Sequence, residues 1–160
     1  MDAGLDALRN DRMFDFVVDT SAYIPRCARA SAEFLADRVG AYALVSTVSV
    51  YPELGTLGID ENTPIGRLTE VDPDKTDKID KVDNENYGPL KALCEEAAEA
   101  ALPGRTFDVR PGLIVGPRDE TDRFTYWPQR VQQSEEVVAP GRPRPQSTAR
   151  RRLGLVCSKT

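Results

Sequence analysis

Histidine is absent from this sequence, cysteine is scarce, and no apolar run approaches 18 residues. Without an imidazole, catalysis by a Ser-His or Cys-His pair is excluded and a zinc site is disfavoured. The three cysteines (Cys27, Cys94 and Cys157) are odd in number and widely spaced, which argues against a disulfide framework. The N-terminus also lacks the basic and then apolar pattern of a secretory signal. These absences predict a soluble, cytoplasmic protein with no membrane partner.

Acidic residues are missing from the last 20 positions, although they dominate the rest of the chain. Residues 1–140 carry 15 basic against 26 acidic side chains, whereas residues 141–160 carry six basic side chains and no acidic one. A chain of 160 residues with 40% hydrophobic content can bury the core of one domain. We therefore expect one domain over residues 1–140 and a basic, disordered tail over residues 141–160. The acidic body argues against a nucleic-acid partner.

The segment from residue 53 to residue 86 is acidic and contains a recurring Asp-Lys pair, which predicts a charged surface loop. Calcium is a poor alternative, because the glycine and the terminal glutamate of an EF-hand loop are not in register. No metal site is expected.

Two buried strands with a helix between them are predicted in the first third of the chain. Phe14–Asp19 is a short apolar run, Pro25 opens a helix that extends to about Val39, and residues 41–51 form a second strand that Pro52 closes. A strand, a helix and a strand with short joints make a parallel crossover unit. A third strand is predicted over residues 106–110. The fold class is therefore α/β, with a parallel sheet and flanking helices, and the aromatic segment 124–130 begins a further helix.

Tyr87 and Lys91 stand four residues apart at the start of a predicted helix, so that a phenol and an ammonium lie on one face. Asn86 is a good N-cap, and Pro89 is tolerated in the first turn. The stripe that follows is typical of a helix lying on a core: Leu90, Leu93, Cys94, Ala97, Ala98 and Ala101. A nearby cation favours a phenolate, so the pair is a candidate proton-transfer device. A solvated Tyr and Lys on a helix surface would give the same pattern.

Two further features are expected near this pair. Ser46 and Thr47 follow the apolar part of the second strand, and the Pro- and Gly-containing segment 111–117 follows the third strand. In open α/β sheets the carboxyl ends of parallel strands meet at one crevice, where ligands bind. Hydroxyl groups, the Tyr/Lys pair and the loop therefore converge. Taken alone, Ser46 and Thr47 would be ordinary strand residues.

The order of these motifs resembles the extended short-chain dehydrogenases/reductases, the NAD-dependent epimerase/dehydratase family. Three stretches carry the resemblance: Ser46-Thr47-Val48-Ser49-Val50-Tyr51, Tyr87-Gly88-Pro89-Leu90-Lys91, and Arg110-Pro111-Gly112-Leu113-Ile114-Val115-Gly116-Pro117. The resemblance spans roughly residues 13 to 140. It implies a Rossmann-like sheet, NAD or NADP as cofactor, and the activity of an oxidoreductase or isomerase on a sugar nucleotide or a similar hydroxylated substrate.

The resemblance also implies a role for individual residues. Tyr87 corresponds to the general acid/base and is also expected to contact the cofactor, and Lys91 corresponds to the residue that promotes ionisation of the phenol and holds the nicotinamide ribose. Thr47 corresponds to the hydroxyl that polarises the substrate oxygen, with Ser46 as the less favoured substitute. Thr20, Ser21 and Ala22 resemble the turn beside the dinucleotide. The segment from Pro111 to Ile114 resembles the loop against the nicotinamide.

The sequence departs from this family at its start. The family begins with a strand and a Gly-x-x-Gly-x-x-Gly turn that binds the pyrophosphate, and this chain has no such turn. Its first strand, near Phe14, corresponds to the family's fourth, so the first βαβαβ half is expected to be absent. A parallel strand left uncovered exposes unpaired amides, so we expect a homodimer, an aggregate or a recruited partner at this sheet edge.

The sequence also departs from the family at Leu113, where sugar-nucleotide members often have Asn nearby, and at the basic tail, which we attribute to a frameshift after about Pro143. Two functions follow as hypotheses. The first is an NAD(P)-dependent epimerase, dehydratase or reductase that is truncated and inactive alone. The second is a non-catalytic binding or assembly protein built on half a dinucleotide fold, with the tail contacting an acidic partner.

Overall fold

The computed structural model describes residues 12–67, 82–83, 85–116, 125–133, 136 and 155–159. They belong to two compact units. The first contains Met1–Gly112 together with Leu153–Thr160, and the second contains Leu113–Arg152. The domain boundary predicted at residue 140 lies outside the described residues. Thr47, Tyr87 and Lys91 all belong to the first unit, which is therefore taken first.

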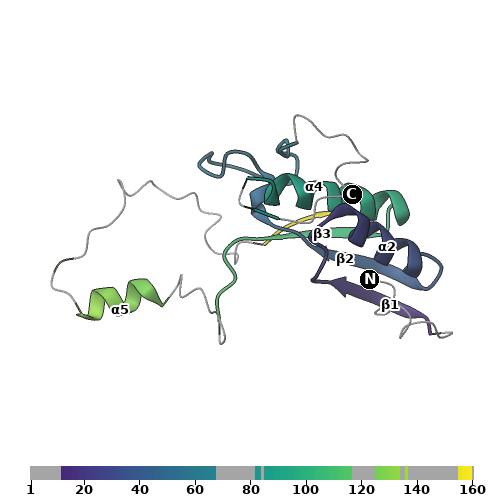
Figure 1. Ribbon diagram of the computed structural model, residues 1–160, viewed down its shortest axis with the longest axis horizontal. Helices are drawn as coiled ribbons and strands as arrows, with labels where there is room; N and C mark the ends of the chain where they lie inside the picture. The colour runs from purple at the N-terminus through teal and green to yellow at the C-terminus, as the bar shows by residue number, and fades with distance from the viewer. Residues whose placement is uncertain are drawn as a thin grey trace. The chain divides into compact units, whose positions relative to one another are not determined.

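A sheet forms the centre of the first unit (Figure 1). Its described strands are β1 (Phe14–Asp19), β2 (Val39–Val45), β3 (Thr106–Pro111) and β4 (Leu155–Lys159), and they lie side by side in that order. The first three are parallel, with Val17 beside Tyr42 and Leu44 beside Asp108. This parallel sheet with packed helices confirms the predicted α/β class and is consistent with an incomplete Rossmann-like fold.

The helices α2 (Pro25–Leu35) and α4 (Tyr87–Ala101) pack against each other and against one face of the sheet (Figure 1). Pro25 lies in the first turn of α2, where its missing N–H removes no intrahelical hydrogen bond. In α4 the predicted apolar stripe is confirmed, because its members are buried or half-buried. The buried core contains Ala22, Ala28, Ala32, Leu35, Val39, Tyr42, Leu44, Cys94, Ala97, Ala98 and Leu102.

Both the first helix and the second strand are shorter than predicted. Helix α2 ends at Leu35 instead of Val39, because a turn follows in which the Arg38 amide donates to the Leu35 carbonyl. The Arg38 carbonyl then accepts from the Phe14 amide, which places Val39 at the start of β2. Strand β2 ends at Val45 instead of residue 51, and the 3₁₀ helix η1 (Val48–Val50) follows it.

Strand β4 was not predicted from the sequence. It lies antiparallel to β3, with Cys157 beside Val109 and Leu155 beside Pro111. It occupies part of the tail that was predicted to be disordered. Residues 141–154 and Thr160 lie outside the described residues, so the prediction for them, including the frameshift, remains a prediction.

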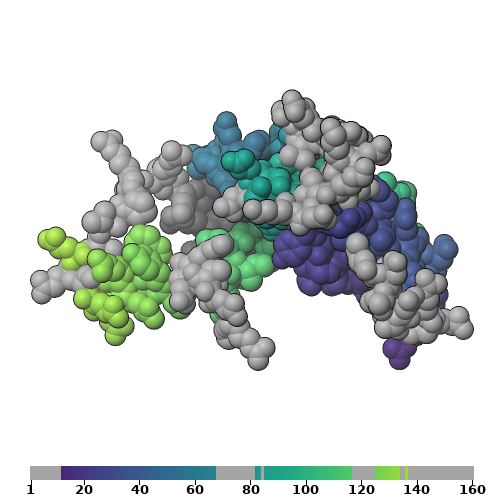
Figure 2. Space-filling view, in the orientation of Figure 1, coloured from purple at the N-terminus to yellow at the C-terminus, as the bar shows by residue number. Residues whose placement is uncertain are grey.

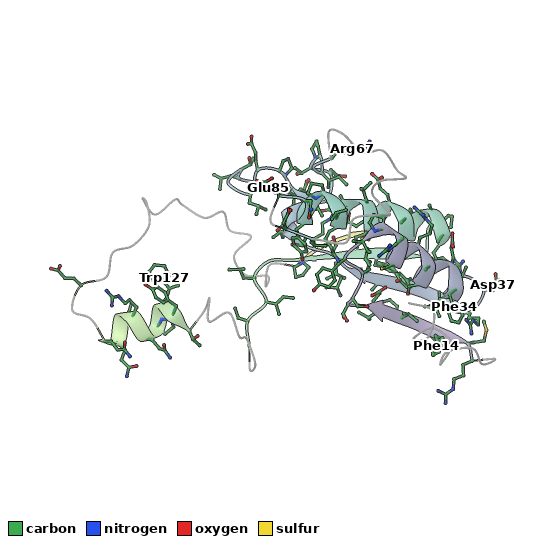
Figure 3. The ribbon with its side chains drawn as sticks, in the orientation of Figure 1. Phe14, Phe34, Asp37, Arg67, Glu85 and Trp127 are labelled. Atoms are coloured by element: carbon green, nitrogen blue, oxygen red, sulfur yellow. The ribbon has the colours of Figure 1, made fainter. Side chains whose placement is uncertain are left out.

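The second unit contains one described helix, α5 (Tyr126–Gln133), at the aromatic segment where a helix was predicted. Its side chains are exposed, and Trp127 is among them (Figure 3). The rings of Tyr126 and Trp127 meet edge to face with centroids 5.2 Å apart. In the part of the chain that the structure describes, neither this helix nor any other is both long enough and apolar enough to span a bilayer.

Candidate functional site

Lys91 joins three separate segments of the first unit. Its side chain is only 2% exposed, and the ammonium donates to the carbonyl oxygens of Ala22 and Val45, both at 2.6 Å. Ala22 lies in the turn after β1, and Val45 is the last residue of β2. Lys91 therefore fastens the first turns of α4 to the carboxyl ends of two parallel strands, where ligands bind in open α/β sheets.

The surroundings of Lys91 lower its pKa. Burial removes water from the ammonium and lowers the pKa of Lys91, although the nearby groups Cys94, Asp19, Glu95 and Asp108 act in the opposite direction. An ammonium has three N–H donors, and the two carbonyls use two of them. One donor therefore remains for a further acceptor, and the face of Tyr23 lies 5.4 Å from the nitrogen.

Tyr87 lies in the first turn of α4 and is half-buried. Its ring packs against the exposed ring of Tyr23, with centroids 6.3 Å apart and planes tilted by 36°. Tyr23 thus contacts both members of the predicted Tyr/Lys pair. The side chain of Asn86 does not cap the helix as predicted, because its Oδ1 accepts from the Asp83 amide instead.

Gly88 fixes the distance between α4 and the end of β2. A Cβ atom at this position would lie 2.1 Å from the carbonyl oxygen of Ser49, far inside contact distance. Only glycine permits this approach, which brings the start of α4 onto η1. The segment that carries Thr47 and the turn that carries Tyr87 are therefore packed together.

The two candidate hydroxyls have different environments. Thr47 is the N-cap of η1: its Oγ1 accepts from the Ser49 amide at 3.1 Å and donates to the Ser49 hydroxyl at 3.2 Å. Ser46 is 4% exposed, and its Oγ has no hydrogen-bond partner in the described part of the protein. Its backbone amide still donates to the Val109 carbonyl, so its position beside β3 is fixed.

The residues predicted to bind the cofactor have different surroundings. Thr20 and Ser21 are exposed, and the Ser21 amide and hydroxyl both donate to Asp19, which shapes the turn after β1. Ala22 is buried and supplies a carbonyl to Lys91. Pro111 is half-buried at the end of β3, whereas Ile114 belongs to the second unit and is 73% exposed.

An ion pair beneath the site was missed by the sequence analysis. The Arg110 guanidinium donates to both carboxylate oxygens of Glu95, at 3.0 and 2.6 Å, and to the Tyr51 hydroxyl at 2.8 Å. Burial opposes the charge on Arg110, but the hydrogen bond and the charge of Glu95 outweigh it and raise the pKa of Arg110. The sequence did offer one indication of this pair. Glu95 follows Lys91 by four residues, so both charges lie on the same, inward face of the helix.

Asp108 lies on the same strand face as Arg110 and was also missed. It is 1% exposed, and its Oδ1 has no hydrogen-bond partner among the described residues. Burial raises the pKa of Asp108 to about 7, and the negative charges of Glu95 and Glu99 act in the same direction, against Arg110 and Lys91. The clue was the alternation of polar residues along β3, which places Thr106, Asp108 and Arg110 on one face.

Asp19 forms a smaller polar centre at the end of β1. The hydroxyl of Tyr42 donates to its Oδ2 at 2.6 Å, while Ser21 binds Oδ1. Burial alone would raise the pKa of Asp19, but these hydrogen bonds outweigh it and lower the pKa. A carboxylate is thus held ionised beside the turn that carries Ala22.

No protein-family model matches the chain, and neither the curated proteins nor the solved structures contain a significant match to it. Within the described residues, no group of three or more Cys, Asp or Glu side chains is arranged to hold a metal ion. The interpretation of the site therefore rests on its own geometry.

Proposed function

We propose that the chain is a protein of the NAD(P)-dependent epimerase, dehydratase or reductase type, similar to the extended short-chain dehydrogenases/reductases, and that it is cytoplasmic. Its substrate is a sugar nucleotide or a similar hydroxylated compound. The observation that supports this proposal is the position of Lys91. A buried ammonium that uses two of its three N–H groups on described carbonyls stands at the carboxyl ends of β1 and β2, one helical turn after Tyr87.

The residues present fit the nicotinamide side of the cofactor and do not fit its adenosine side. On the nicotinamide side, two polar groups have no further partner among the described residues, the third N–H of Lys91 and the Oγ of Ser46, and Ala22 lies in the turn after β1; these are the groups proposed to bind ribose hydroxyls. On the adenosine side, the chain has no glycine-rich turn to bind the pyrophosphate. We therefore expect weak binding and little or no turnover by this chain alone.

The chemistry assigns a separate task to each residue. When bound, NAD(P) supplies hydride acceptance and return. Tyr87 exchanges a proton with the substrate hydroxyl, and the Lys91 ammonium lies one helical turn further along the same helix. The Thr47 hydroxyl orients the substrate oxygen, for which it must release its hydrogen bond to Ser49.

Isothermal titration calorimetry with NAD and NADP tests this function. We expect saturable binding by the unmodified chain, weakened about threefold to tenfold in Tyr87→Phe, which corresponds to the loss of one ordinary hydrogen bond. Tyr126→Phe is the matched control, because Tyr126 is an exposed tyrosine of the second unit, and its affinity should not change. Absence of binding, or equal binding by all three proteins, would exclude the proposed site.

The alternative is a non-catalytic binding or assembly protein. The engagement of Thr47 as a helix cap and of Lys91 by two main-chain carbonyls favours it, because both side chains already have structural tasks. In that case the Tyr87→Phe chain would match the unmodified chain in every binding assay. The basic tail would then contact an acidic partner, and binding to that partner would weaken as salt is added.

A further inference from the structure

One face of the sheet is apolar and is not covered by a described helix. The hydroxyl of Tyr42 reaches Ser31 of α2, so Tyr42 points to the helix side, and residues one position away along the strands point to the other side. The side chains on this open face are Phe16, Val18, Ala41, Ala43, Val45, Phe107 and Val109. Parallel sheets are ordinarily covered on both faces, and no described helix covers this one.

The exposed part of this face lies on β1. Phe16 and Val18 are 52% and 53% exposed, whereas Ala43 on the next strand is 4% exposed. The ring of Phe16 extends toward Phe107 on β3, with centroids 6.3 Å apart. Atoms of this part of the chain reach the surface in Figure 2, where they are purple. The apolar row is therefore open at the margin of the sheet.

The outer edge of β1 has main-chain groups that can pair with another strand. β1 is the outermost described strand of the sheet, and its neighbour β2 lies on one side only. Proteins protect such edges with charged side chains, proline or a bulge, and β1, Phe-Asp-Phe-Val-Val-Asp, has no lysine or proline but carries Asp15 and Asp19. Its N–H and C=O groups are in regular extended geometry, which is the geometry that a further strand requires.

We propose that a second copy of this chain pairs with β1 in an antiparallel β1–β1 contact about a twofold axis. The structure favours a second copy because the same strand supplies both the hydrogen-bonding edge and the apolar row, which makes the edge self-complementary. The contact joins two sheets into one and brings the Phe16 rings of the two copies together on the open face.

The charges of β1 select the register of this contact. Opposed residues of an antiparallel pair point to the same face, so the twofold axis must pass midway between the two copies of one residue. Two registers pair five of the six residues of β1, one with the axis at Phe16 and one with the axis at Val17. An axis at Val17 sets Asp15 against Asp19 twice, and directly opposed like charges are unfavourable. An axis at Phe16 sets Asp15 against Val17 and Phe14 against Val18, so this register is expected.

Cysteine cross-linking of the full chain tests the register. In Phe16→Cys, the two introduced thiols face each other across the axis with Cα atoms about 4.5–5.5 Å apart, which a disulfide spans. Mild oxidation should convert the protein from 17.7 kDa to a covalent dimer of twice that mass, and the mass spectrum should contain a disulfide-linked peptide that joins position 16 of both copies. The native cysteines are kept, because the linked peptide identifies the pair.

Val18→Cys is the matched control, because Val18 is equally exposed on the same face. In the expected register the two copies of residue 18 are displaced by four residues, or about 14 Å along the strand, which is too far for a disulfide. Cross-linking of Val18→Cys would overturn the proposal. So would cross-linking of Val17→Cys together with no cross-linking of Phe16→Cys. So would sedimentation equilibrium that shows only monomer up to about 100 μM, a concentration at which weak dimers of micromolar Kd are populated. Neither measurement depends on cofactor binding, so this inference can fail independently of the proposed function.

Discussion

Replacing Asp108 with asparagine is expected to change how the stability of the protein depends on pH. The side chain is buried, its Oδ1 has no described partner, and its pKa is raised from 3.8 to about 7. Because the folded protein then binds a proton more readily than the unfolded chain, this residue lowers stability as pH rises from about 4 to above 7. The contribution of Asp108 to the unfolding free energy is most favourable below pH 4, and it is lost as the pH rises through 7.

The magnitude follows from the difference between the two pKa values. About three pKa units, at about 1.4 kcal/mol each, correspond to roughly 4 kcal/mol of unfolding free energy between pH 4 and pH 8. Asparagine has almost the same shape and does not titrate. The difference between the two proteins therefore isolates this carboxyl, because Glu95, Glu99, Arg110 and Lys91 are present in both.

Urea unfolding at pH 4, 5, 6, 7 and 8 measures the effect, with free energies from linear extrapolation. We expect the Asp108→Asn protein to gain stability relative to the unmodified protein as pH rises. Asp37→Asn is the control, since Asp37 is exposed in the turn after α2 (Figure 3) and its curve should parallel that of the unmodified protein. Parallel curves for Asp108→Asn as well would refute the argument.

Two further predictions concern the packing around α4. Gly88→Ala would place a Cβ against the Ser49 carbonyl, so the unfolding free energy measured with urea should fall by about 1–3 kcal/mol. Gly116→Ala is the control, because no atom lies within 4 Å of the added Cβ, and its unfolding free energy should be unchanged. Glu95→Ala leaves Arg110 buried without its carboxylate and should lower the unfolding free energy by about 3–5 kcal/mol. Glu96→Ala is the control, because Glu96 is exposed, and it should lower the unfolding free energy by under about 0.5 kcal/mol; thermal unfolding measures both. Equal effects within either pair would contradict the packing described above.

The elements with strong local signals were predictable from the sequence. Pro25 and a run of small residues define α2, and the apolar spacing after Tyr87 defines α4. The limits of β2 were not predictable, because residues 46–50 are as compatible with a strand as the residues before them. The strand ends where Thr47 turns its hydroxyl back to the Ser49 amide, a choice that depends on the approach of Gly88. Strand β4 depends on pairing with β3 from more than 40 residues away in the chain, which leaves no local signal.

The sequence predicts which elements carry the candidate residues, but it does not predict the contacts that these side chains make. Four-residue spacing placed Tyr87 and Lys91 on one helix face, and topology placed that face at the ends of the strands. The burial of Lys91 between the carbonyls of Ala22 and Val45 depends on the turn after β1 and on the end of β2, which are brought to α4 by tertiary contacts. The charged residues Glu95 and Arg110 are buried as a pair, and a hydrophobic pattern does not reveal paired charges.

The most direct test of the central claim uses the two halves of the dinucleotide separately. Under the proposed function, the chain should bind nicotinamide mononucleotide at the ends of β1 and β2 and should not bind AMP, because the sequence has no glycine-rich turn for the adenosine side. In ¹H–¹⁵N NMR spectra, nicotinamide mononucleotide is predicted to shift the amide signals of Ala22, Ser46 and Lys91, and Tyr87→Phe should reduce these shifts. An AMP titration that moves the same signals equally, or a nicotinamide mononucleotide titration that leaves them in place, would contradict the account.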